Sequence, residues 1–486
     1  MKKNAHRTFV GLLGLGLFAL PLAGALESNA ATQPVAQTKS TAAQRKKVSI
    51  TVYNQGYGLV REVRDLSLAQ GTVSLEFADV ASQIQPATVH IRATQDPAAL
   101  QVLEQNYRYD LLGPTTLLDK YVGRKIKVYR WNEKRGTDEA FDAEVLSVQG
   151  NRPVLRINGE ITFDFPGRMA FPEVPPNLIA KPTLVWLLDS KKPKQEAEIT
   201  YLTQGMRWNA DYVFVIDEND AKGDLTGWVT LTNNSGTSYD DAQLKLVAGD
   251  VNIAPPMDMA MPTGRVATAA TASRPQFQEE GFFEYHLYTL ERPTTVRDNE
   301  QKQVTLLEGR GIKIDKKLVF RGMEYFWQSH IPEPIKNQKV SVFLEVNNAQ
   351  TNGLGMPLPQ GVVRVYKADK SGAKQFVGED RIDHTPRDEK IRVKMGEAFD
   401  VVGERKQTDF DALGTCGSES AWEISLRNHK DTAVEVEDWE PVSGDWEIVS
   451  ESQKSRKEDA HTFVYTAKIP ARGAVKISYR VRVRWC

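Results

Sequence analysis

Cysteine, histidine and an excess of either charge are what this sequence has little of. Only two of its 486 residues are cysteine and seven are histidine, and 62 basic residues balance 63 acidic ones. A polyanion is attracted by a net positive field, which a chain with this balance does not provide. The composition therefore argues against nucleic acid as a partner.

The sequence also lacks the short motifs that assemble metal and cofactor sites. The two closest histidines, His429 and His461, are 32 residues apart, so no histidine pair has the spacing of a local metal-binding motif. There is no G-x-S-x-G turn, no phosphate-binding glycine loop and no complete dinucleotide motif. We therefore expect no metal and no cofactor. A catalytic site would have to be assembled by the fold from separate parts of the chain.

Long apolar runs are absent except at the N-terminus. Residues 2–7 carry three basic side chains, residues 9–22 are mostly apolar, and Ala23 and Ala25 form the A-x-A pattern of a cleavage site. The apolar run is shorter than the ~20 residues that span a bilayer. We therefore predict a signal peptide over residues 1–25, cleaved between about residue 25 and 31, and no transmembrane segment in the mature chain. The protein is expected to be exported, either periplasmic or extracellular.

What the chain does contain is alternation of apolar and polar residues, which is typical of strands with one buried face. Residues 225–252 hold two such runs around a polar loop, and we predict that they pair as an antiparallel hairpin. Asn158-Gly159, between two further runs, is a strong signal for a tight hairpin turn. Residues 475–485 alternate without interruption, which predicts a half-exposed strand.

This pattern predicts a mainly β, multidomain protein, because 486 residues exceed what one hydrophobic core organises. The larger units are expected to be antiparallel β-sandwiches, and the short, closely spaced strands of residues 113–172 predict a small SH3-like barrel. The predicted segments are a signal peptide (1–25), a flexible tether (26–46), an N-terminal β domain (47–112), the barrel insertion (113–172), a β-sandwich (173–253), a disordered linker or long loop (254–280), a second β domain (281–395) and an immunoglobulin-like sandwich (396–486).

Asp383 and His384 are the only candidates for catalysis, and they are weak ones. A histidine beside a carboxylate can act as a general base. The same pair can equally cap the turn before Pro386, and no nucleophile accompanies it. The tryptophans are spread over many predicted strands and are expected to fill cores. A carbohydrate-binding site would need several of them exposed in one groove.

Cys416 and Cys486 are the two cysteines. If residues 397–410 form the first strand of the C-terminal sandwich, the last strand runs parallel to it and ends beside the loop that holds Cys416. An oxidising compartment would then favour a disulfide between the two residues. Two free thiols are the alternative.

Several long stretches resemble a bacterial family that is defined only as a domain of unknown function, number 4139. They are residues 225–252, FFEYHLYTLERPTTVRDNEQKQVTLLE from Phe282, GEDRIDHTPRDEKIRVKMGEAFDV from Gly378, SAWEISLRNHKD from Ser420, GDWEIVSES from Gly444 and the terminal VRVRW. The resemblance covers roughly residues 195–486. Residues 48–77 resemble the N-terminal domain of mucoidy-inhibitor-like proteins, whose coiled coil this chain lacks. The family implies export and a β fold, and it implies no activity and no catalytic residues.

These observations predict an exported, non-enzymatic protein of the cell envelope. We expect it to act through its surfaces and sheet edges on another envelope protein or a cell-surface glycan. The alternatives are an exported hydrolase with a site near His384 and a carbohydrate-binding protein.

Overall fold

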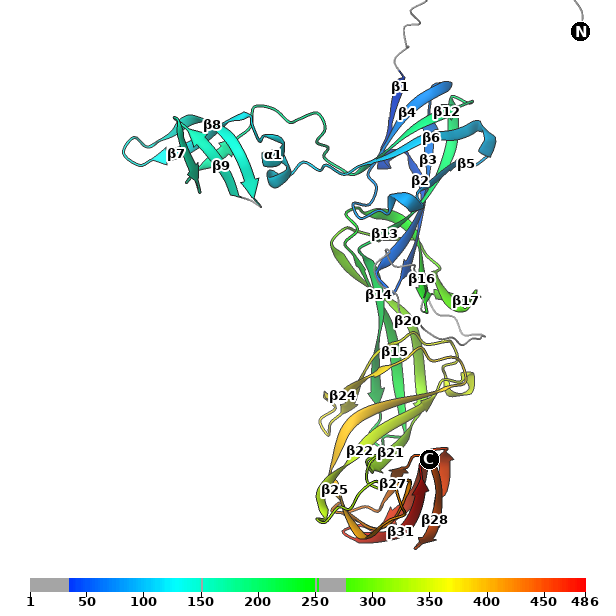
Figure 1. The fold of residues 1–486 in the computed structure, drawn as a ribbon. Coiled ribbons are helices and arrows are strands. Elements are labelled where there is room, and N and C mark those ends of the chain that lie inside the picture. The colour runs from blue at the N-terminus through cyan, green and yellow to red at the C-terminus, as the bar shows by residue number, and fades with distance from the viewer. Residues whose placement is uncertain (1–34, 150–151, 250, 253–276) are drawn as a thin grey trace, which may run out of the picture.

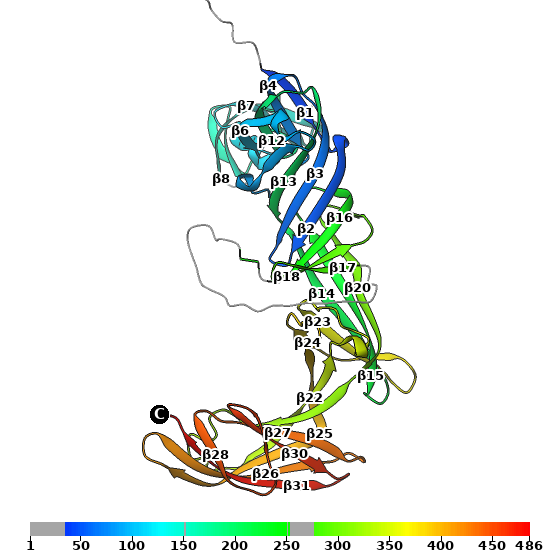
Figure 2. The ribbon, with the colours of Figure 1, turned by 90° about the vertical axis from the view of Figure 1, so that its right-hand side faces the viewer.

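The computed structural model describes residues 35–149, 152–249, 251–252 and 277–486, which are mainly strand. The sheets follow one another along a long axis, and an inserted module projects sideways near the N-terminal end (Figures 1 and 2). None of the helices in these ranges is long and apolar enough to cross a membrane. The predicted signal peptide and most of the predicted linker over 254–280 lie outside the described residues.

The N-terminal end is a four-stranded sheet in the order β1-β4-β12-β6. Its strands are β1 (Ala36–Ser40), β4 (Gly71–Ala78), β6 (Leu100–Arg108) and β12 (Thr183–Ser190). The prediction of a flexible tether over residues 26–46 is wrong from residue 36 onward, because β1 runs parallel to β4 there. The polar side chains of this segment show no apolar–polar alternation that would indicate a strand. A strand can still form, since backbone groups and not side chains make the hydrogen bonds between strands.

A second sheet combines strands that are far apart in the sequence, in the order β17-β18-β16-β2-β3-β13-β5, with β19 beside β16. Its strands are β2 (Arg45–Tyr53), β3 (Tyr57–Ser67), β5 (His90–Ala93), β13 (Lys194–Gln204), β16 (Tyr239–Ala248), β17 (Phe277–Phe282), β18 (Tyr285–Leu290) and β19 (Thr294–Val296). β16 runs parallel to β2, with Leu246 opposite Val52. This sheet therefore draws on three of the segments that the sequence suggested as separate units.

A third sheet occupies the middle of the long axis, in the order β20-β15-β14-β23-β24. Its strands are β14 (Met206–Ile216), β15 (Lys222–Asn233), β20 (Glu300–Lys313), β23 (Gly361–Ala368) and β24 (Lys374–Ile382). The hairpin predicted over residues 225–252 is wrong, because β15 pairs with β14 and β20 whereas β16 belongs to the second sheet. Both predicted strands exist and bury their apolar residues, so the alternation identified the faces but not the neighbours.

The insertion is a separate small module with its own core. It consists of α1 (Pro114–Lys120), β7 (Lys125–Asn132), β8 (Thr137–Gln149), β9 (Arg152–Ile157), β10 (Glu160–Phe163) and β11 (Arg168–Ala170). Asn158 and Gly159 both have positive φ and join β9 to β10, as predicted. The five-stranded sheet does not close into the expected barrel, because its short end strands β10 and β11 do not pair with each other.

The C-terminal module is one nine-stranded sheet that curves around a core of its own, in the order β28-β31-β26-β25-β22-β21-β27-β30-β29. Its strands are β21 (Asp315–Arg321), β22 (Ile335–Asn347), β25 (Lys390–Ala412), β26 (Gly417–Asn428), β27 (Val434–Pro441), β28 (Asp445–Glu451), β29 (Arg456–Asp459), β30 (Thr462–Ile469) and β31 (Ala474–Arg484). A single core joins the two halves of this sheet and is separate from the core that runs through the first three sheets. The alternation predicted for residues 475–485 is that of β31, whose apolar side chains face this core.

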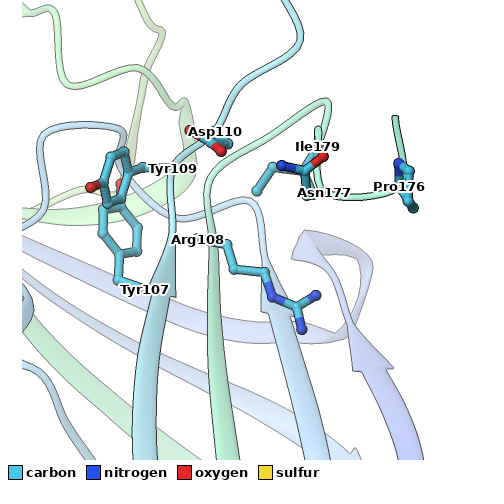
Figure 3. Close-up of a pocket in the computed structure, with 7 residues that line it drawn as sticks. All are labelled: Tyr107, Arg108, Tyr109, Asp110, Pro176, Asn177 and Ile179. Carbon is cyan, nitrogen blue, oxygen red and sulfur yellow. The ribbon is translucent and has the colours of Figure 1, made fainter. Parts of the chain in front are cut away.

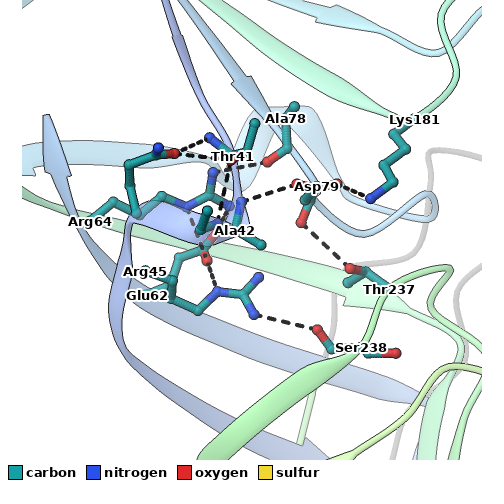
Figure 4. Close-up of polar contacts among 12 residues, drawn as sticks. Thr41, Ala42, Arg45, Glu62, Arg64, Ala78, Asp79, Lys181, Thr237 and Ser238 are labelled. Atoms are coloured by element: carbon teal, nitrogen blue, oxygen red, sulfur yellow. Dashed lines mark hydrogen bonds and ion pairs between the residues drawn. The ribbon is translucent and has the colours of Figure 1, made fainter. Parts of the chain in front are cut away.

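Buried arginines tie the strands together in two places. In the N-terminal half, Arg64 donates to Glu62 (3.0 Å) and to the carbonyl of Ala78 (2.9 Å), and its guanidinium lies 3.5 Å from the ring centre of Phe77. Arg45 donates to the other oxygen of Glu62, as Figure 4 shows. Because each buried polar group needs a partner, this network holds β2, β3 and β4 in one register.

In the C-terminal module, Arg405 is fully buried and lies between two carboxylates. Its Nη2 donates to Asp438 Oδ1 (3.1 Å) and to Glu440 Oε1, and the Tyr479 hydroxyl donates to the other oxygen of Glu440 (2.8 Å). Burial raises the pKa of the Asp438 carboxyl well above its ordinary value of 3.8, and the charge of Glu440 adds to the effect. The Asp438 carboxyl therefore binds its proton more tightly in the folded protein than in the unfolded chain.

Asp438→Asn is expected to remove part of the pH dependence of stability. An acid whose pKa is raised by folding makes the free energy of unfolding fall as the pH rises above about 4, through the pKa of the folded state. Urea unfolding across this range should show that fall in the parent protein and a flatter curve in the variant. Asp409→Asn is the matched control. Arg480 lowers the pKa of Asp409, so this carboxylate instead loses its contribution as the pH falls. An unchanged slope in Asp438→Asn would contradict the assignment.

Candidate functional site

Asp383 and His384 lie in the turn that follows β24. The backbone N–H of Gln360 donates to His384 Nδ1 (3.2 Å), and the hydroxyl of Thr385 donates to the carbonyl of Asp383 (2.9 Å). The Asp383 side chain is exposed, and neither residue lines the cavities of about 580 Å³ and 420 Å³. The structure therefore places the pair in a hydrogen-bonded turn. Among the described residues, no cluster of three or more His, Cys, Asp or Glu could hold a metal ion.

The tryptophans do not gather in one groove within the described part of the chain. Trp186, Trp208 and Trp422 are at most 1% exposed and belong to the cores. Trp131 and Trp485 are exposed, but they lie in the insertion and at the C-terminal end of the chain. The groove of exposed tryptophans that a carbohydrate-binding surface was expected to need is therefore not formed.

Cys416 and Cys486 are bonded to each other in the structure, with Cα atoms 5.5 Å apart. The direction of the last strand agrees with the one predicted. β31 and β25 are both antiparallel to β26, which lies between them, so β31 runs in the same direction as β25 and Arg484 lies opposite Gly417. The two cysteines meet because Cys416 immediately precedes β26 and Cys486 closely follows its partner strand.

A cavity of about 580 Å³ lies at the base of the insertion, where the chain leaves the N-terminal sheet and returns to it. It is lined by Tyr107, Arg108, Tyr109, Asp110, Pro176, Asn177 and Ile179 (Figure 3). The outgoing and returning segments are joined by two backbone hydrogen bonds, from Ile179 to Asp110 (3.0 Å) and from Leu112 to Ile179 (2.9 Å). The cavity therefore has walls from two segments about 70 residues apart in sequence, which sequence patterns alone do not bring together.

The charged groups of this cavity are already paired within the chain. Arg108 donates to Glu76 (2.8 Å), and Lys120 donates to Asp110 (2.7 Å). The Tyr107 hydroxyl donates to the carbonyl of Ser82 (3.0 Å), and burial raises the pKa of this tyrosine to about 12. Tyr109, in contrast, is 69% exposed. The cavity therefore offers a neutral surface with an exposed ring and carries no activated nucleophile.

β6 continues from this cavity as an exposed sheet edge. It pairs with β12 on one side, and within the described chain no strand pairs with its other side. Seven of its nine residues are exposed, and Val102 and Leu103 are 41% and 47% exposed. It contains neither lysine nor proline, so its protection is limited to Glu104, Arg108 and a bulge next to Leu103. By comparison, the end strands β20, β24 and β28 each carry at least three charged residues.

The face of the N-terminal sheet next to this edge is acidic. Glu104 on β6 lies opposite Leu187 on β12. Asp189 follows Leu187 by two residues, and residues two apart in a strand share a face, so Glu104 and Asp189 point to the same side of the sheet. Within the described chain neither carboxylate has an ion-pair partner, whereas Glu76 further along is paired with Arg108. No sequence pattern marks this edge, since the composition of β6 resembles that of any polar strand and its lack of a partner is visible only in the fold.

The model of the family described as a domain of unknown function, DUF4139, matches residues 197–486. No curated protein matches the chain. The matched residues include β14 to β31, whereas β6, the insertion and the cavity at its base lie outside them.

Proposed function

The chain belongs to the DUF4139 family, a domain of unknown function, and we propose that it is a non-enzymatic recognition protein exported to the bacterial cell envelope. Export is supported by the basic, apolar and A-x-A segments within residues 1–25. The mature protein then works in the periplasm or outside the cell.

The free edge of β6 carries the proposal. An exposed strand whose outer edge has no partner strand can accept an extended segment of another protein as an additional strand, which supplies main-chain hydrogen bonds along its length. The regular part of β6 is Glu104–Arg108, since a bulge interrupts the pairing with β12 next to Leu103. The acidic face beside Glu104 favours basic side chains on one face of the added segment. The exposed Val102 favours apolar side chains on its other face.

The partner is therefore an envelope protein with an extended segment in which apolar and basic residues alternate. A cell-surface glycan is the second candidate, favoured by the exposed ring of Tyr109, which lines the same cavity as Asn177. Hydrolysis near His384 has no further support, because Asp383 and His384 line neither described cavity. The two partner classes separate experimentally, since only a protein partner gives a polypeptide adduct after cross-linking.

A photo-crosslinking amino acid in place of Asn106 tests the proposal in intact cells. We expect a discrete polypeptide adduct from Asn106, reduced several-fold by Glu104→Lys, because an exposed ion pair contributes up to about 1 kcal/mol and reversal also adds repulsion. The same cross-linker at Phe376, on the charged edge strand β24, is the matched control and should give no such adduct. Equal adducts at both positions, or none at Asn106, would contradict recognition by this edge.

Export is tested separately by the intact mass of the protein purified from cells. The mature chain should begin between residues 26 and 31, and deletion of residues 2–22 should keep the full-length chain in the cytoplasm. Fractionation of the cells measures the second result. An unprocessed chain found in the cytoplasm of cells that express the parent sequence would disprove export.

A further inference from the structure

A second cavity, of about 420 Å³, lies where three chain turns meet. These are the turn between β2 and β3, the turn between β13 and β14, and the start of the loop between β15 and β16, and the loop that follows β4 adds Gln83 to the lining. The polar side chains include Gln55, Tyr57, Gln83, Gln204, Arg207 and Asn234. Because β13 belongs to the second sheet and β14 to the third, the cavity sits at the junction of two sheets along the long axis (Figure 1).

The walls of this cavity are held together by hydrogen bonds between segments that are distant in the sequence. The Gln83 side chain donates to the carbonyl of Asn234 (2.8 Å), and the N–H of Asn234 donates to the carbonyl of Gly205 (2.7 Å). Gly205 has φ +81°, and a Cβ there would lie only 2.7 Å from the Asn234 carbonyl oxygen. Only glycine fits this turn without strain, so the turn that presents Gln204 and Arg207 is preorganised.

The electrostatic character of the lining is unusual for this protein. The cavity has no carboxylate in its lining. Arg207 is exposed, and within the described chain its guanidinium forms none of the ion pairs that occupy most other arginines. Around it are three glutamines and one asparagine. Gln55 and Gln83 already donate to the carbonyls of Gly249 (3.0 Å) and Asn234 (2.8 Å), and the remaining amide N–H and carbonyl groups can donate and accept hydrogen bonds. A guanidinium that has no ion-pair partner among the described residues and lies beside amide groups suits a ligand that carries one negative charge and several hydroxyl groups.

We propose that this cavity binds a carboxylated saccharide, such as a uronic acid unit of an acidic glycan. Arg207 takes the carboxylate through charge-assisted hydrogen bonds, and the amides of Gln55, Gln204 and Asn234 bind the sugar hydroxyls. Tyr57 lines the same cavity and offers an aromatic face to the sugar ring. A phosphate group would meet only this one positive charge. The site is independent of β6, so it adds a ligand that the proposed protein partner does not require.

Saturation-transfer NMR with the full mature chain tests this assignment, with D-glucuronate as the probe and D-glucose, acetate and inorganic phosphate as the other arms. We expect glucuronate to bind in the millimolar range and more tightly than each of the other three. Arg207→Gln should weaken glucuronate binding by about tenfold, the usual loss for one charge-assisted hydrogen bond. Arg292→Gln, at an exposed arginine that also lacks an ion pair within the described chain, should leave the affinity unchanged.

The remaining outcomes decide against the proposal in distinct ways. Equal binding of acetate and glucuronate would reduce the site to a simple anion site, and tighter binding of phosphate would replace the saccharide by a phosphorylated ligand. No binding of glucuronate up to about 50 mM would remove the site altogether. An unchanged affinity in Arg207→Gln with an unchanged circular dichroism spectrum would locate the binding elsewhere. None of these results bears on cross-linking from Asn106, so the two proposals fail independently.

Discussion

Arg405→Met is expected to lower the free energy of unfolding of the C-terminal module by about 3–5 kcal/mol. The variant would keep a side chain of similar length but would leave the buried carboxylates of Asp438 and Glu440 without their counter-charge. Arg405 also stacks on Phe320, with its guanidinium carbon 4.5 Å from the ring centre. Because a buried charge without a partner costs far more than a lost surface contact, the effect should be among the largest of any single substitution.

Chemical unfolding, followed by the fluorescence of the C-terminal tryptophans, measures the change. Arg480→Met is the control, since Arg480 pairs with Glu419 on the partly exposed face of the same sheet and should cost less than about 1 kcal/mol. The triple variant Arg405→Met, Asp438→Leu, Glu440→Leu separates charge from packing and should recover most of the loss. A loss in Arg405→Met no larger than that in Arg480→Met would show that the buried cluster does not support the fold.

Cys486→Ser is expected to destabilise the same module by about 4 kcal/mol under oxidising conditions. The bond between Cys416 and Cys486 closes a ring with a sequence separation of 70, and opening such a ring returns conformational entropy to the unfolded chain. β31 lies between β26 and β28 and ends at this bond, so the last strand of the module should fray first. Hydrogen exchange of the β31 amides would report this fraying directly.

Dithiothreitol supplies the control for this prediction. It should lower the stability of the parent protein to that of Cys486→Ser and leave the variant unchanged, because only the parent has a bond to reduce. The intact mass of the parent should rise by two hydrogens on reduction. Two thiols that react with an alkylating reagent in the folded, unreduced protein would show that the bond does not form in the cell.

The alternation of apolar and polar residues was sufficient to predict most strands and the direction in which their side chains point. The pair Asn158-Gly159 was sufficient to predict one complete hairpin, because both residues accept the positive φ of a two-residue turn. Alternation was not sufficient to predict the partners of β15 and β16, which follow one another in sequence but lie in different sheets. A two-residue period shows which face of a strand is buried, but it does not show which other strand pairs with it.

In the candidate sites, too, the sequence shows only which residues are neighbours along the chain, and the fold decides which residues lie together. Asp383 and His384 attracted attention because they are neighbours in sequence, whereas the two cavities are lined by residues from distant segments. Tyr109 and Asn177 were ordinary loop residues until the outgoing and returning strands of the insertion brought them together. Arg207 was one arginine among many, and what distinguishes it is its place in a cavity whose lining contains no carboxylate.

The sequence by itself determined the β class of this protein, its family, the faces of its strands and the absence of a local metal or cofactor motif. These follow from composition, periodicity and spacing along the chain, which are local properties. Only the tertiary structure decided which strands are neighbours, which edge remains open and which charges remain unpaired. The physical reason is that backbone hydrogen bonds can join any two strands of compatible register, so the partner of a strand is chosen by the packing of the whole chain.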